Sequence, residues 1–297
     1  MIYKNKHNLP PEVYTALTAD NYAHNFDPKF ISATSLIKSP KERVLALRHH
    51  SDIETDVMEN VWRVFGSACH HIFENQKTDN IKERRLSVEI DGMTLTGQSD
   101  LYLPKDKMIR DYKVTSVWHI VFGEKESFKD YTNQLNIYAY LHEVNDFEVN
   151  GLEVVAILRD FNKRESALKP ELPQEPIISI PIALWSKDEQ ERYIKERIAL
   201  HKQVLGLADD DIPVCSPAER WEKPGSWAIH KGNNIKAMKV CSNKADAELF
   251  MANYGKQYPL EKLRLEERLG KCGKCEGYCS AQRFCNFGKS LLAAEIK

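Results

Sequence analysis

The chain has 297 residues, enough to bury a substantial core as one large domain or two small ones. Hydrophobic residues make up 42% and charged residues 29%, which is ordinary for a globular protein. The 42 lysines and arginines nearly cancel the 43 aspartates and glutamates. Overall charge therefore does not indicate a nucleic-acid partner, and any such surface must be a local patch.

The sequence shows no membrane or secretion signal. No apolar run approaches the roughly 20 residues that span a bilayer, and residues 1–11 lack the apolar stretch of a secretory signal. We therefore expect a soluble protein of the cytoplasm. The seven cysteines do not suit a disulfide set, because their number is odd and four lie between 272 and 285.

The first part of the chain is expected to be helical and irregular. Ser39 as N-cap, Pro40 at the first helical position and Glu42 in a capping box predict a helix to about residue 49. Apolar residues at helical spacing predict a second helix over about 55–75.

A three-stranded meander follows. Residues 86–90 and 93–103 flank Asp91-Gly92, which is a strong hairpin signal, and a turn over 104–107 leads to a strand over 108–114.

The later elements alternate between helix and strand. Their patterns predict a helix over 128–144, strands over 152–158 and 177–184 around a polar excursion, a charged helix over 186–207, a hairpin over 227–240 and a helix over 243–254. This order predicts an α/β core over residues 1–208 and a small α+β appendage over 209–297.

Two aspartates mark the meander as a candidate site. If the turn spans 104–107, opposed residues have numbers that sum to 211, so Asp100 faces Asp111 about 5 Å away. Lys113 follows on the same face, because side chains alternate along a strand. Opposed like charges destabilise a hairpin unless a cation such as Mg²⁺ lies between them. The alternative is a solvated polar face in a different register.

The helices on either side carry further polar groups. Gly66, His70 and Glu74 lie on one helical face, so His70 is a candidate metal ligand, and Gly66 suggests close approach of another backbone. Gln134 and Tyr138 lie one turn apart and could bond a phosphate oxygen or orient water. Alternatively, these are ordinary surface or core residues of amphipathic helices.

In chain order, G-x-x-x-H-x-x-x-E, G-x-x-D, D-Y-K and Q-L-x-x-Y resemble the RecB-like branch of the PD-(D/E)XK nuclease superfamily. The closest likeness is to phage exonucleases and CRISPR-associated RecB-like nucleases, and it covers about residues 31–141. Residues 31–40 also look like the opening helix of such phage proteins. The resemblance implies a restriction-endonuclease-like core, which is a central mixed β-sheet flanked by helices.

The resemblance also implies roles for individual residues. The implied metal ligands for Mg²⁺ or Mn²⁺ are His70, Asp100, Asp111 and the carbonyl of Tyr112. Lys113 would be the catalytic lysine, with Gln134 and Tyr138 near the scissile phosphate. The second acidic position, often Glu in the family, is Asp111 here, a variant that the superfamily accepts.

Cys272, Cys275, Cys279 and Cys285 are dense enough to hold zinc or an iron–sulfur cluster, or to remain reduced thiols without a metal. Several RecB-like nucleases carry a 4Fe–4S cluster on one distant cysteine and three near the C-terminus. By that resemblance the C-terminal three are Cys275, Cys279 and Cys285, with Cys272 as an alternative, and the distant one is Cys215 or Cys69.

The appendage also carries basic and aromatic residues. These could contact a DNA backbone or stack on a base, or could form a solvated face over a small core: Lys231, Lys236, Lys239, Lys244, Trp221 and Trp227.

Together these patterns predict a Mg²⁺-dependent deoxyribonuclease, with an exonuclease of phage recombination or DNA processing as the leading hypothesis. A structure-specific or CRISPR-adaptation-type endonuclease is the first alternative, and a non-catalytic DNA-binding module on the same fold is the second. The expected partners are DNA and a phage single-strand annealing or single-strand-binding protein, with no membrane. If the chain is phage-encoded, its compartment is the cytoplasm of a bacterial host.

Overall fold

The computed structural model describes residues 1–19, 25–122, 127–258 and 262–295. The chain divides into two compact units, Met1–Ala208 and Asp209–Lys297. No helix among the described residues is long and apolar enough to cross a membrane.

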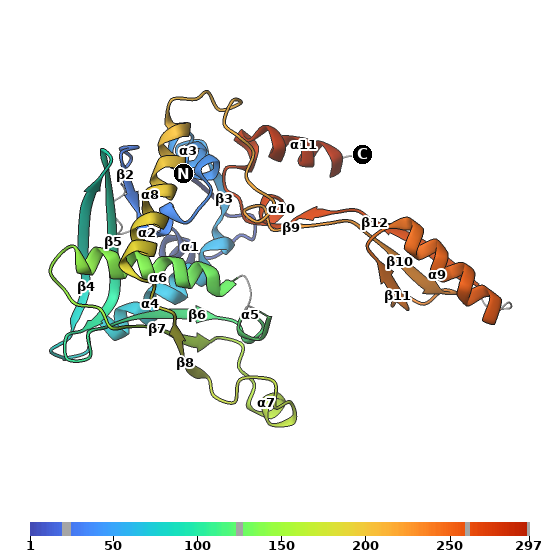
Figure 1. The fold of residues 1–297 in the computed structure, drawn as a ribbon, viewed down its shortest axis with the longest axis horizontal. Helices are drawn as coiled ribbons and strands as arrows, with labels where there is room; N and C mark the ends of the chain where they lie inside the picture. The colour runs from blue at the N-terminus through green and yellow to red at the C-terminus, as the bar shows by residue number, and fades with distance from the viewer. Residues whose placement is uncertain (20–24, 123–126, 259–261, 296–297) are drawn as a thin grey trace. The chain divides into compact units, whose positions relative to one another are not determined.

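A six-stranded mixed sheet forms the centre of the first unit (Figure 1). Its strands are β2 (Phe30–Ser32), β4 (Ile81–Ile90), β5 (Met93–Leu103), β6 (Met108–Thr115), β7 (Gly151–Leu158) and β8 (Ile177–Ile182). β2, β5, β6, β7 and β8 are neighbours in that order, and β4 pairs with β5. β4, β5 and β6 form the predicted antiparallel meander, whereas β6 and β7 run parallel.

Helices flank this sheet. They are α1 (Pro11–Thr18), α2 (Ala33–Leu36), α3 (Pro40–Arg48), α4 (Val61–Glu74), α5 (Val117–Phe122), α6 (Ser127–Glu143), α7 (Lys163–Leu168) and α8 (Lys187–Leu205). A short parallel pair, β1 (Ile2–Lys4) and β3 (Glu54–Asp56), and the 3₁₀ helix η1 (Val57–Asn60) complete the unit. α6 contacts β4 to β8 and α8, and α4 contacts β6. The unit therefore has the predicted α/β architecture, a mixed sheet flanked by helices.

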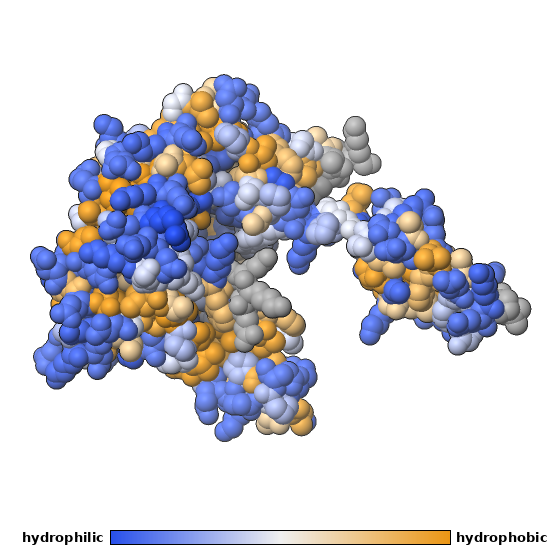
Figure 2. Space-filling model, in the orientation of Figure 1, coloured by the Kyte–Doolittle hydropathy of each residue, from blue (hydrophilic) through white to orange (hydrophobic). Residues whose placement is uncertain are grey.

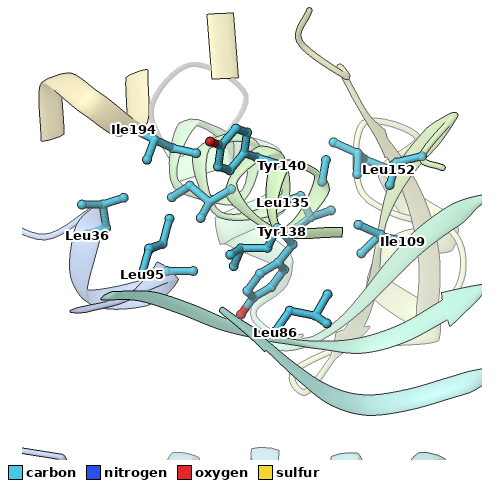
Figure 3. Close-up of a cluster of buried hydrophobic side chains, with 14 of the residues drawn as sticks. Leu36, Leu86, Leu95, Ile109, Leu135, Tyr138, Tyr140, Leu152 and Ile194 are labelled. Carbon is cyan, nitrogen blue, oxygen red and sulfur yellow. The ribbon is translucent and has the colours of Figure 1, made fainter. Parts of the chain in front are cut away.

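The main core surrounds α6, whose Leu135 is fully buried. In Figure 3, Tyr138 points from α6 towards the strand that carries Leu86, and Tyr140 points to the other side, near Ile194 of α8. A Cβ at Gly97 of β5 would lie 3.0 Å from the Tyr138 ring. A glycine at this position therefore lets α6 approach the sheet closely.

The surface of this unit is mixed. On the face drawn in Figure 2, hydrophilic residues predominate and hydrophobic residues are interspersed among them.

Both predicted turns of the meander are confirmed. Asp91 and Gly92, at φ 49° and 74°, close the pair Ile90↔Met93, as a two-residue hairpin turn requires. The turn over 104–107 closes the next hairpin, between β5 and β6.

Some predicted boundaries are wrong. The helix predicted from residue 55 begins only at Val61, and the 3₁₀ helix η1 precedes it, capped by Asp56, which accepts a hydrogen bond from the Met58 amide. Ser39 precedes α3 but makes no side-chain capping bond. The strand predicted from Leu86 begins five residues earlier, at Ile81 (86 − 81 = 5).

The second unit contains a three-stranded antiparallel sheet in the order β11-β10-β12, with α9 against β10. Its elements are β9 (Glu222–Lys223), β10 (Ser226–Lys231), β11 (Lys239–Cys241), α9 (Lys244–Gln257), β12 (Leu263–Arg268), β13 (Lys271–Cys272), α10 (Gly273–Gly277), η2 (Gln282–Phe284) and α11 (Asn286–Glu295). Ile229, Cys241 and Ala247 form its small core. The predicted hairpin is thus two strands of this sheet, and β12 was not predicted.

Candidate metal centre

The candidate site lies where β6 leaves β5. The register of these strands is the predicted one, but the last backbone pair is Leu101↔Arg110. Asp100 and Asp111 therefore lie just beyond the paired region, and not across a continuous ladder as expected. There the Tyr112 amide donates a hydrogen bond of 2.7 Å to Oδ2 of Asp100. The Asp100 side chain thus replaces a backbone acceptor at the point where the strands part.

Lys113, which is half-buried, forms an ion pair with the buried carboxylate of Asp111. Asp111 is 1% exposed, and Lys113 Nζ lies 2.6 Å from its Oδ2. Burial lowers the pKa of the Lys113 ammonium, but the charges of Asp111 and Asp100 outweigh it, so the pKa lies above its ordinary value. A protonated Lys113 neutralises Asp111 and could stabilise a phosphate, but in this state it cannot accept a proton from water.

His70 of α4 meets two carboxylates. Its Nδ1 lies 3.4 Å from Asp100 Oδ1 and 3.9 Å from Glu83 Oε1, and the ligand atoms of the three residues all lie within 4.8 Å of one another. The hydrogen bond to Asp100 raises the pKa of His70 more than burial lowers it, and the charges of Asp100 and Asp111 add to the rise.

Sequence reasoning missed Glu83. It lies in β4, between the pairs Lys82↔Leu101 and Arg84↔Ser99, which places it opposite Asp100. The φ angle of Glu83 is 49°, a left-handed value that is uncommon for a residue other than glycine. Such a conformation persists only where the surroundings enforce it.

Gln98 holds the Glu83 carboxylate and is itself held by Arg85. Gln98 Nε2 donates a hydrogen bond of 2.6 Å to Glu83 Oε2, and Gln98 Oε1 accepts one of 2.8 Å from Arg85. Burial raises the pKa of Glu83, and the Gln98 hydrogen bond partly offsets this rise.

The donor set fits a divalent cation, since an imidazole nitrogen and carboxylate oxygens are ligands used for such metals. Of the predicted ligands, His70 and Asp100 lie together and Glu83 joins them. Asp111 contacts Lys113. Tyr112 donates its amide to Asp100, and its ring stacks on Phe73 with centroids 4.3 Å apart.

The α4 motif also contains Glu74 and Gly66. Glu74 is exposed and lies outside the His70 cluster. A Cβ at Gly66 would meet no heavy atom within 4 Å. The prediction that Gly66 permits close approach of another backbone is therefore wrong.

Gln134 and Tyr138 lie together in the core beside the ion pair. Gln134 Nε2 donates a hydrogen bond of 2.8 Å to the Tyr138 hydroxyl, and both residues are buried. Burial, followed by the charge of Asp111, raises the pKa of Tyr138, so the hydroxyl remains protonated.

Five cysteines gather within the second unit. Burial, followed by the charges of its neighbours, raises the pKa of Cys275 to about 12; these neighbours are Cys279, Cys215, Cys272 and Cys285. Cys215 therefore belongs to the group, whereas Cys69 lies on α4 in the first unit.

Two of the predicted DNA-contacting lysines lie over the small core of this unit. Lys239 Nζ is 4.4 Å from the Phe250 ring centroid, and Lys244 Nζ is 5.4 Å from that of Trp227. Both make cation–π contacts, which agrees with the alternative of a solvated face over a core.

No family model and no curated protein matches the chain. Among solved structures it is similar to a protein named SSO0001, with 12% identity over 64% of this chain and 82% of that one and a TM-score of 0.41. A phage related exonuclease from Haemophilus somnus 129PT is 16% identical, over 65% of this chain and 77% of the exonuclease, with a TM-score of 0.31. An alkaline exonuclease from Laribacter hongkongensis is 10% identical, over 60% of this chain and 90% of that enzyme, with a TM-score of 0.37. These values are too low to carry an argument about function.

The His70–Asp100 contact predicts a pH dependence in metal-free protein. The folded pKa of His70 is raised above its unfolded value of about 6.5. The contact therefore makes its full contribution to the free energy of unfolding below that pH. This contribution is lost as pH rises through the folded pKa. Asp100→Asn should lower the His70 pKa, as measured by NMR titration in EDTA, and should remove this part of the pH dependence of unfolding.

His119 is the internal reference for that titration, because burial lowers its pKa without Asp100. An unchanged His70 titration in Asp100→Asn would contradict the assignment of the contact.

Proposed function

We propose that this chain is a divalent-metal-dependent nuclease that hydrolyses phosphodiester bonds in DNA. The observation that carries the proposal is the cluster of His70, Glu83 and Asp100 beside the Asp111–Lys113 ion pair. Carboxylates and an imidazole suit a divalent cation, and a neighbouring ammonium suits a phosphate oxygen. The motif resemblance at Asp100, Asp111 and Lys113 adds support from the sequence.

Each residue has a distinct task in this proposal. His70, Glu83 and Asp100 would hold a cation, with Asp111 as a further candidate ligand on the other side of Asp100. A bound cation would act as a Lewis acid at the phosphate and lower the pKa of a coordinated water. Lys113 would bind a phosphate oxygen and stabilise the charge that develops on it. The buried pair of Gln134 and Tyr138 would support the position of Asp111 and Lys113 from behind.

The finer proposal is an exonuclease of phage recombination or DNA processing that works with a single-strand annealing or single-strand-binding protein. A structure-specific or CRISPR-adaptation-type endonuclease would use the same residues. A non-catalytic DNA-binding module is the remaining alternative, and the ion-paired Asp111 and Lys113 argue against it, because binding alone does not require a buried carboxylate.

A cleavage assay tests the activity. The protein should degrade DNA with Mg²⁺ and not with EDTA, and Lys113→Met should reduce the rate by about a hundredfold or more. Linear duplex, closed circular duplex and single-stranded DNA should be compared, since an exonuclease spares closed circles. Absence of Mg²⁺-dependent cleavage of all three substrates, or full activity in Asp111→Ala, would refute the proposal.

A metal-binding measurement tests the role of Glu83 separately. Glu83→Gln should weaken Mn²⁺ binding by at least about tenfold in calorimetry, because a carboxylate donor is lost. Gln98→Leu should weaken it less, since Gln98 only positions Glu83. Glu74→Gln is the matched control, because Glu74 is an exposed acid outside the cluster. Equal Mn²⁺ affinity in Glu83→Gln and Glu74→Gln would remove Glu83 from the site.

We also propose that Cys215, Cys275, Cys279 and Cys285 hold a metal group, a 4Fe–4S cluster or zinc, with Cys272 as an alternative ligand. If the group is a cluster, protein purified without oxygen should contain iron and show an absorbance shoulder at about 400 nm. Cys275→Ser should lose the metal, whereas Cys241→Ser, a core cysteine of the same unit, should keep it. Protein with neither iron nor zinc would contradict this proposal.

A further inference from the structure

α4 is rich in apolar residues, yet none of its residues is buried. Trp62 is 55% exposed and Phe65 is 45% exposed, and they contact each other edge to face. Single exposed apolar residues are ordinary, but neighbouring exposed aromatic rings often mark a binding surface. The same helix carries His70 of the candidate metal centre.

Helix geometry connects the exposed tryptophan with the metal centre. Trp62 precedes His70 by eight residues, which corresponds to about 12 Å along the axis and about 80° around it. Gly66 lies midway between them, and a Cβ there would meet no heavy atom within 4 Å. A side chain at Gly66 would therefore have space on the face of α4 that runs from Trp62 to His70. We call this face the α4 track.

Contacts at the two ends show what the α4 track faces. Phe73 stacks on Tyr112 of β6, and the Arg159 guanidinium, directly after β7, lies 4.2 Å from the centroid of the Trp62 ring. Three side chains of β6 and β7 between these contacts are only half-buried: Val114, Val155 and Ile157. The track is thus bordered by apolar side chains, with a guanidinium at one end and the carboxylate cluster at the other.

This arrangement matches the chemistry of an unpaired DNA strand. Aromatic rings stack on bases and cations bind phosphates, whereas a duplex keeps its bases turned inward. At 3.4 Å for each stacked nucleotide, about 12 Å corresponds to three or four nucleotides. A strand with one base against Trp62 would then have a phosphate a few nucleotides away at His70.

We propose that the α4 track binds the unpaired strand of a DNA end and leads it from Trp62 and Arg159 to the metal centre. This inference rests on the proposed nuclease function and specifies the form of its substrate. Gly66 leaves room for the strand, and Trp62 stacks on one base. Arg159 holds the Trp62 ring and attracts the phosphate backbone.

Binding in EDTA tests the α4 track without cleavage. The full chain is titrated with a fluorescently labelled duplex that carries a short unpaired tail, and with the same duplex blunt-ended. Trp62→Ala should weaken binding of the tailed DNA about fivefold to a hundredfold, the range for loss of one stacked base. Trp62→Phe should retain most of the affinity, and blunt DNA should be affected less.

Gly66→Leu separates a functional role from a structural one. Leucine is the better helix former and its Cβ would meet no heavy atom within 4 Å, so the thermal midpoint should not fall. Binding of the tailed duplex should nevertheless weaken, because the side chain would obstruct the strand. Ile72→Ala is the matched control, since Ile72 is 60% exposed on the same helix but lies about 160° around it from His70.

The outcomes separate this inference from the proposed function. If the unaltered chain binds and cleaves DNA, and Trp62→Ala and Gly66→Leu bind the tailed duplex as tightly as it does, the α4 track alone is overturned. An equal loss in Ile72→Ala would also overturn it. A changed elution volume of these variants in size-exclusion chromatography would instead identify an interface between copies of the chain. Failure of the unaltered chain to cleave either DNA with Mg²⁺ would overturn the nuclease proposal, and the track with it.

Discussion

The hydrogen bond from the Tyr112 amide to the Asp100 carboxylate is the contact on which the candidate site depends. Asp100 lies one residue and Tyr112 two residues beyond the last β5–β6 backbone pair, and the bond satisfies an amide that this ladder no longer reaches. One oxygen of Asp100 is thereby fixed, and Oδ1 lies 3.4 Å from His70. The geometry of the site therefore follows from where the backbone pairing of β5 and β6 stops.

The charges around this point do not balance. Glu83, Asp100 and Asp111 supply three carboxylates, whereas Lys113 is the one neighbouring ammonium among the contacts described and His70 is an imidazole that titrates. Half-buried carboxylates are costly when they lack counter-charge, and burial raises the pKa of Glu83 accordingly. A divalent cation would relieve this excess. The electrostatics of the fold therefore favour a cation independently of any resemblance to known nucleases.

Local chemistry explains how far the sequence predicted the structure. The turns at 91–92 and 104–107 were predictable because turn residues act on their own backbone, and these turns set the register that brings Asp100 near Asp111. Glu83 was not predictable, because residues 82–85 are all charged and show no strand alternation. Its position depends on the extension of β4 along β5, which only the folded sheet provides. The cysteine group likewise required folding to bring Cys215 to the C-terminal four.

Gly66 and Gly97 show why a glycine in a motif needs its neighbours before it can be interpreted. In the sequence, Gly66 suggested a close backbone approach, whereas Gly97 was only the first letter of G-x-x-D. In the structure a Cβ at Gly97 would lie 2.5 Å from Leu141 Cδ1 and 3.0 Å from the Tyr138 ring, so any larger residue at this position would force these α6 side chains to move. Gly66 lacks any such neighbour, so packing does not explain a residue that costs a helix about 1 kcal/mol relative to alanine. That cost is reasonable if the space itself is used, and the space borders the helix face that leads to His70.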